Sequence, residues 1–166
     1  MQKPISFSQA DHMLAKSGQM PFLKMLKEET ENELHLVIFG AVVKENTDFG
    51  DSCGNPVLDT ILAQCKPIVL DSSRRFDIVF EEYIIYQVRN ESYSSFDELE
   101  ERSGTYLLQF QKSHFLDFLS IATDAQQLKD GSFYPAPWKH YEIRTQNHII
   151  DVIAQKGPKV LYSENA

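Results

Sequence analysis

The sequence predicts an α+β protein in which several helices pack against a single mixed, largely antiparallel sheet. Apolar side chains occupy every second position over residues 76–88 except Glu82, which is typical of a strand. Helical spacing of apolar residues follows cap signals before 56–65 and 114–124. A length of 166 residues suits one hydrophobic core, so we expect one globular domain spanning residues 1–166.

Five segments are expected to form the sheet. The run ELHLVIFGAVV is rich in β-branched and large apolar residues, which predicts a buried strand. The segments PIVLD and FDIVFEEYIIYQVRN are separated by SSRR, which predicts an antiparallel hairpin with its turn at 72–75. The expected strands are 34–43, 67–71, 76–89, 105–111 and 139 to about 153.

Helix starts are indicated by residues that bind free backbone amides or fix the first turn. Asn55 followed by Pro56 predicts a helix over 56–65, whose apolar face includes Cys65 and would bury that thiol. Ser113 precedes a helical pattern at 114–124. Further helices are expected at 9–17 after Ser8, from Pro21 through 22–30, and after the capping box of Ser95 and Glu98.

The charge balance disfavours two classes of partner. There are 16 basic and 24 acidic residues, which gives a net charge of −8 and a pI of about 5.1. Such a field repels phosphate backbones and anionic lipid headgroups and attracts a basic protein. We therefore expect no nucleic acid and no membrane as a partner, and a basic protein as the favoured one.

The sequence also favours the cytoplasm. The longest apolar run, LVIFGAVV at 36–43, is too short to span a bilayer, and the N-terminal MQKPISFSQADHM lacks the apolar core of a signal peptide. Two cysteines are too few for a disulfide framework. No glycine-rich phosphate loop, nucleophile elbow or twelve-residue calcium loop is visible, so no cofactor is expected. His140 and His148 would lie about 26 Å apart on one strand, too far to share a metal.

Cys53, His148 and Asp151 are the candidate catalytic residues. Cys53 comes two residues before the Asn55 cap, where the helix dipole favours a thiolate. A cysteine hydrolase also needs a histidine brought close by the fold, and His140 or His148 could serve. The residues around Cys53 match no known signature of such enzymes.

His148 and Asp151 have two readings. On a helix they share one face, and the carboxylate could orient the imidazole for acid–base catalysis. On a strand they point to opposite faces. The β-rich HYEIRTQ favours the strand, although a short helix over NHIIDVIAQ closed by Gly157 remains open. We therefore expect both residues to serve structure or a binding surface.

Three segments resemble an uncharacterised family of small bacterial proteins: VRNESY at 88–93, SHFLDFL at 113–119 and HYEIRTQNHIIDVI at 140–153. The resemblance implies a compact bacterial cytoplasmic domain and supplies no activity or catalytic residue. The function expected from the sequence is a noncatalytic interaction module, of the immunity or accessory type, which binds a basic protein partner. The alternative is a small hydrolase that uses Cys53 or His148.

Overall fold

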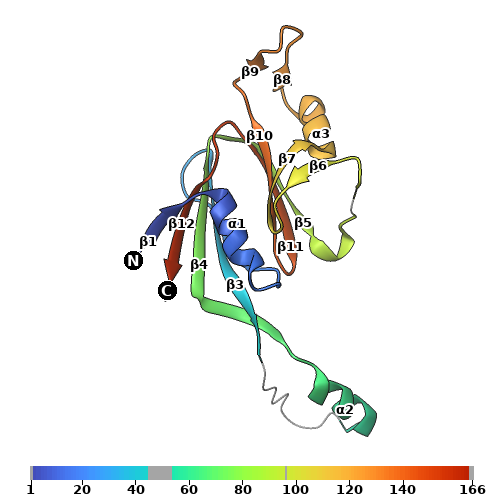
Figure 1. Ribbon diagram of the computed structural model, residues 1–166. Coiled ribbons are helices and arrows are strands. Elements are labelled where there is room, and N and C mark those ends of the chain that lie inside the picture. The colour runs from blue at the N-terminus through green and yellow to red at the C-terminus, as the bar shows by residue number, and fades with distance from the viewer. Residues whose placement is uncertain (1, 45–53, 96, 165–166) are drawn as a thin grey trace.

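The computed structural model describes residues 2–44, 54–95 and 97–164, of which 50% lie in strands and 19% in helices. Two five-stranded antiparallel sheets dominate the fold (Figure 1). The first sheet has the order β1 Gln2–Ile5, β12 Lys159–Glu164, β4 Ile68–Glu81, β3 Glu33–Val43 and β2 Phe22–Glu28. The second has the order β5 Tyr83–Asn90, β11 His148–Ala154, β10 Lys139–Arg144, β7 Leu107–Lys112 and β6 Glu101–Ser103.

The main hydrophobic core lies between the two sheets. Alternate residues of each strand point inward, as the period of two requires. From the first sheet the fully buried side chains include those of Leu36, Ile38, Phe76 and Ile78, and from the second those of Ile143, Ile150 and Val152. These residues form one contiguous cluster, so the two sheets share a single core.

Helix α1, Phe7–Ala15, adds Ala10 and Leu14 to this core. Its N-cap is Ser6, whose side chain and that of Gln9 form a capping box. The buried carboxylate of Asp11 accepts hydrogen bonds from the backbone amides of residues 105–107 at 2.8–3.1 Å. This contact ties α1 to the start of β7.

Helix α3, His114–Ala122, covers the outer face of the second sheet. Its buried residues Phe115 and Leu119 form a second cluster with Ala125 and Ile153. The helix begins at the N-cap Ser113, whose Oγ accepts the amide hydrogen of Leu116. The short strands β8 Gln126–Gln127 and β9 Phe133–Tyr134 form a hairpin beyond the helix. The remaining helical turn is the 3₁₀ segment Glu91–Tyr93.

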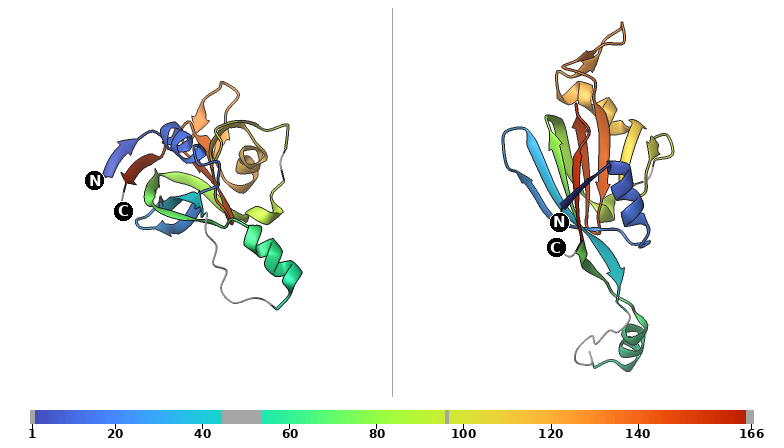
Figure 2. Two further views of the ribbon diagram at one scale, coloured as in Figure 1. Left: turned by 60° about the horizontal axis from the view of Figure 1, so that its bottom comes forward. Right: turned by 60° about the vertical axis from the view of Figure 1, so that its left-hand side comes forward.

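Helix α2, Pro56–Gln64, lies apart from the two sheets, at the end of a ribbon in which residues 40–43 of β3 pair with 68–71 of β4 (Figure 2). Asn55 caps this helix, as predicted. Its apolar residues Val57, Leu58 and Ile61 are exposed, because no other element covers them among the described residues.

The prediction of an α+β fold with a single mixed sheet and several packed helices is wrong. The chain is mostly β, and its strands belong to separate sheets. The predicted turn at 72–75 is the middle of the 14-residue strand β4, because β3 pairs with both halves of it across a bulge at Phe39 and Gly40. The chain turns instead at Glu82, which has a φ of 55°, and β5 then joins the second sheet.

One helix prediction and one strand prediction also need correction. Residues 22–30 are not helical, since 22–28 form β2 and pair with β3. The stabilisation from pairing with the buried β3 outweighs the helix propensity of the lysines, leucines and glutamates in this segment. The predicted strand 139–153 is a hairpin, β10 and β11, in which Thr145 binds the backbone of His148 at the turn.

Helix positions agree only in part with the sequence analysis. The helices at 56–64 and 114–122 are found where they were expected, and the first helix starts two residues earlier than expected, at Phe7. Residues 97–100, after the predicted capping box, form a turn. Cys65 is exposed rather than buried, because α2 has no extensive contact with another of the described elements. Over the described residues, no helix is long and apolar enough to cross a membrane.

Candidate functional site

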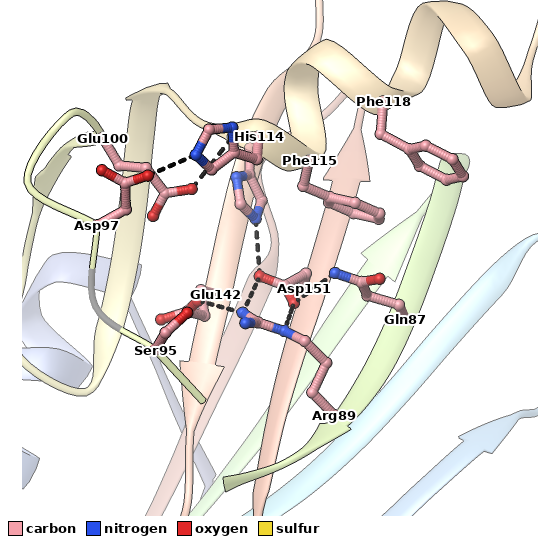
Figure 3. A pocket seen from close by; sticks show the side chains of 11 residues that line it. Gln87, Arg89, Ser95, Asp97, Glu100, His114, Phe115, Phe118, Glu142 and Asp151 are labelled. Atoms are coloured by element: carbon pink, nitrogen blue, oxygen red, sulfur yellow. Dashed lines mark hydrogen bonds and ion pairs between the residues drawn. The ribbon is translucent and has the colours of Figure 1, made fainter. Parts of the chain in front are cut away.

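A pocket of about 450 Å³ opens on the outer face of the second sheet, beside α3 (Figure 3). Its floor is made by side chains of the three adjacent strands β5, β11 and β10. Its wall is made by α3 and by the segment before β6. The floor residues are Gln87, Arg89, Asp151, His140 and Glu142, and the wall residues are Ser95, Asp97, Glu100, His114, Phe115 and Phe118.

The strand register brings the floor residues together. Asp151 lies on β11, between β5 and β10, opposite Gln87 of β5 and opposite Glu142 of β10. Directly opposed residues point to the same face of a sheet. Arg89 and His140 lie two residues from Gln87 and Glu142, so they point to that face as well. Three strands thus place five polar side chains under α3.

Asp151 is the centre of the floor and is 1% exposed. Its Oδ2 accepts hydrogen bonds from Nε2 of Gln87 at 3.0 Å and from Nε of Arg89 at 2.9 Å. Its Oδ1 lies 3.1 Å from Nε2 of His140. Burial alone would raise the pKa of Asp151, but the hydrogen bonds from His140 and Arg89 outweigh it and hold the pKa below its ordinary value. The carboxylate is therefore ionised near neutral pH, and both of its oxygens are hydrogen-bonded.

Glu142 is the second buried carboxylate and is 3% exposed. Nη2 of Arg89 binds its Oε2 at 2.9 Å, and Nε of Arg144 binds its Oε1. Burial raises the pKa of Glu142, the nearby Asp151 adds to that rise, and the bond from Arg144 opposes it. Arg89 therefore bridges two carboxylates whose pKa values move in opposite directions.

Ser113, His140 and Asp151 form a hydrogen-bonded line. Oγ of Ser113 lies 2.8 Å from Nδ1 of His140, whose Nε2 faces Asp151. Oγ of Ser113 can donate to Nδ1 while it accepts the amide hydrogen of Leu116, and Nε2–H can donate to Asp151. The His140 ring also stacks on Phe110, with ring centroids 4.3 Å apart.

Ser113, His140 and Asp151 are the residue types of a serine hydrolase triad. They are not exposed to solvent as the residues of such a triad are. A nucleophile has to contact the substrate, and Ser113 is 2% exposed and is committed to capping α3. Asp151 and His140 are 1% exposed each. The line therefore fixes the start of α3 onto β10 and β11, and it orients the pocket floor.

The mouth of the pocket is more accessible. Nε2 of His114 lies 2.5 Å from Oδ2 of Asp97, and the backbone amide of His114 donates to Oε1 of Glu100 at 3.1 Å. The hydrogen bond to Asp97 raises the pKa of His114, whose side chain is 69% exposed. The amide of Leu99 and then His114 lower the pKa of Asp97. Phe118 adds a 46% exposed aromatic ring beside these groups.

Of the residues predicted from the sequence, the described part of the structure places Asp151 in this pocket and His148 outside it. Asp151 forms its floor. His148 lies three residues away on the same strand, exposed and outside the pocket. Cys53 lies outside the described residues. The histidine that binds Asp151 is His140, which the sequence analysis considered only as a metal ligand or as a partner of Cys53.

Metal ligands do not gather in the part of the chain that the structure describes. No group of three or more His, Cys, Asp or Glu side chains there is arranged to hold a metal ion. Comparisons of the chain with protein-family models, with curated proteins and with solved structures found no match. A function must therefore be argued from the pocket itself.

Proposed function

We propose that the protein is a small noncatalytic interaction module of the cytoplasm, of the immunity or accessory type, and that its pocket receives a cationic side chain of a basic protein partner. The observation that carries this proposal is the charge of the pocket. Four carboxylates line it, those of Asp97, Glu100, Glu142 and Asp151. Arg89 is the one arginine of the lining, and Arg144 and Arg102 pair with Glu142 and Glu100 from outside it. His114 adds positive charge only when it is protonated.

The two layers of the pocket have different roles in this proposal. At the floor, Arg89 is shared by Glu142 and Asp151, so these groups are bonded to one another before any ligand arrives. At the mouth, the side chains of Asp97 and Glu100 are 34% and 19% exposed. The mouth carboxylates are therefore the groups that a partner can reach.

The aromatic wall favours a guanidinium or an ammonium group over a metal ion. A cation over the face of an aromatic ring is attracted by the ring, and a carboxylate beside it adds a charge-assisted hydrogen bond. Phe118 and the pair Asp97 and Glu100 line the same pocket. The net charge of −8 would also steer a basic partner toward the protein.

The alternative hydrolase gains no comparable support. His148 lies outside the pocket, and the buried Ser113 is occupied as a helix cap. Catalysis by Asp151 or Glu142 would need these nearly inaccessible carboxylates to leave their arginine partners. Removing one partner from a buried ion pair is strongly unfavourable.

Binding of an oligo-arginine peptide, followed by isothermal titration calorimetry at low ionic strength, tests the proposal. We compare the wild type with the double variant Asp97→Asn and Glu100→Gln. A matched control, Glu31→Gln with Glu164→Gln, removes two exposed carboxylates elsewhere. The pocket variant should weaken binding by about tenfold or more, equivalent to about 1.4 kcal/mol, and the control by less than about twofold. Equal losses in both variants would show that only the overall charge matters and would contradict the proposal.

A further inference from the structure

The pocket described above is called the acidic pocket from here on. A second hollow, of about 730 Å³, also lies beside α3 and is lined by different residues. It is bordered by β7, by α3, by the β8–β9 hairpin and by the start of β10, which lie near one another in the fold (Figure 1). Its lining includes Gln109, Gln111, Gln126, Gln127, Phe133 and Trp138. None of these residues lines the acidic pocket.

The charged side chains that line this hollow have no net charge. Its only ionisable lining side chains are those of Asp117 and Lys139, one of each sign. A charged ligand would gain little there, in contrast to the acidic pocket. The lining instead combines neutral polar side chains with apolar and aromatic ones, which suits a small neutral molecule that has both polar and apolar surface.

The glutamines supply most of the neutral hydrogen-bonding capacity. Each side-chain amide has two N–H donors and a carbonyl acceptor. In the described part of the chain, the side chains of these four glutamines make no hydrogen bond to protein. They are therefore available to a ligand that offers donors and acceptors together.

Trp138 supplies an apolar surface of fixed position. It is half-buried and packs against the cluster of Phe115, Leu119 and Ile153. The Phe133 ring meets it edge to face, with the centroids 4.8 Å apart and the planes at 87°. Because these contacts hold the indole in place, it needs little ordering when a ligand binds.

We propose that this hollow binds a neutral carbohydrate. A sugar ring has an apolar face of C–H groups that can lie on an indole, and a rim of hydroxyls that donate and accept hydrogen bonds. These two features match Trp138 and the glutamine amides. The site is separate from the acidic pocket, so the inference does not depend on the function proposed above.

The test uses the fluorescence of Trp138, which is the only tryptophan in the chain. The probes are neutral oligosaccharides built from glucose, mannose, galactose or N-acetylglucosamine. At least one should give a saturable change in fluorescence, with a dissociation constant in the range of about 1 mM or tighter, and calorimetry should give the same constant.

Two double variants test whether the oligosaccharide binds in this hollow. Gln127→Ala combined with Gln126→Ala should weaken binding of that oligosaccharide by about tenfold or more, because two donors and acceptors are lost. The double variant Asp97→Asn and Glu100→Gln should leave it unchanged within about twofold. Circular dichroism verifies that each variant is folded.

Three outcomes would overturn the inference. One is the absence of any response across the panel at concentrations of about 10 mM. Another is a response that the glutamine variant leaves intact. The third is a response to a neutral glutamine-rich peptide with none to the sugars, which would assign the hollow to a peptide instead.

Discussion

Nε2 of His140 lies 3.1 Å from Oδ1 of Asp151. The two residues are eleven positions apart in the chain and lie on the adjacent strands β10 and β11. Both side chains are about 1% exposed. A buried charge is stable only when hydrogen bonds and opposite charges compensate it. The stability of this buried pair therefore depends on the neighbouring charged side chains, and substitutions of these side chains should change the free energy of unfolding.

Removal of Arg89 should destabilise the protein. Arg89→Met leaves Glu142 and Asp151 opposed without the guanidinium that bridges them. The side chain is 38% exposed, so we expect a loss of about 2 kcal/mol, below the loss of about 3–5 kcal/mol typical of a fully buried pair. Urea unfolding measures it. Lys27→Met breaks an exposed ion pair with Glu29 and should cost less than about 0.5 kcal/mol. Similar losses in both variants would contradict the bridging role.

The two buried carboxylates should give opposite pH dependences. The lowered pKa of Asp151 means that its contribution to stability is present above the ordinary aspartate pKa and is lost as the pH falls through the folded value. The cost of Asp151→Asn should therefore be greatest near neutral pH and shrink in acid.

The raised pKa of Glu142 has the opposite sign. Its contribution is present below the ordinary glutamate pKa and is lost as the pH rises through the folded value. The cost of Glu142→Gln should therefore be greatest in acid and shrink toward neutral pH. Urea unfolding of both variants and the wild type across this range provides the comparison. Parallel curves for the two variants would show that the pKa directions are wrong.

His114 should titrate above the ordinary histidine range. The hydrogen bond to Asp97 raises the pKa of His114, so Asp97→Asn should lower it again. The imidazole proton resonances in an NMR titration report this directly. Glu31→Gln, far from the pocket, should leave the titration unchanged. An unaltered His114 titration in Asp97→Asn would mean that the two side chains are not paired in solution.

Gly104 should tolerate no side chain. Its φ is +105°, and an added Cβ would lie 2.3 Å from the carbonyl oxygen of Leu107. Both the backbone strain and this backbone clash oppose substitution. We expect Gly104→Ala to destabilise by more than about 3 kcal/mol in urea unfolding. Gly131→Ala, at φ +84° with open space around it, should cost about 1 kcal/mol. Equal costs would argue against the conformation at 104–107.

Local patterns predicted the elements better than their assembly. Asn55 and Ser113 indicated two helix starts correctly, because each cap is a contact with residues two or three positions away. The division into two sheets depends on pairings between distant segments, such as residues 40–43 with 68–71. The polar run at 72–75 resembled a turn, but β4 continues through it, because β3 pairs with residues 68–71 and 75–81 on either side of a bulge and β12 pairs with Arg74 and Arg75.

The candidate site was predictable only in part. The sequence predicts Asp151 on a strand, as a residue of structure or of a binding surface. Its partner His140 was missed, because the chain between them was read as one continuous strand. The polar residues 145–147 lie between two apolar alternating runs and were the available signal for the turn. The placement of Ser95, Asp97 and Glu100 beside α3 has no local signal in the sequence.

The central claim is that the acidic pocket receives a cationic group, and amide chemical shifts measured while the oligo-arginine peptide is added to isotopically labelled protein test it most directly. The account predicts saturable shifts concentrated at Asp97, Glu100, His114 and Phe118. Shifts concentrated instead on the exposed apolar residues of α2, or spread evenly over acidic side chains of the whole surface, would contradict it.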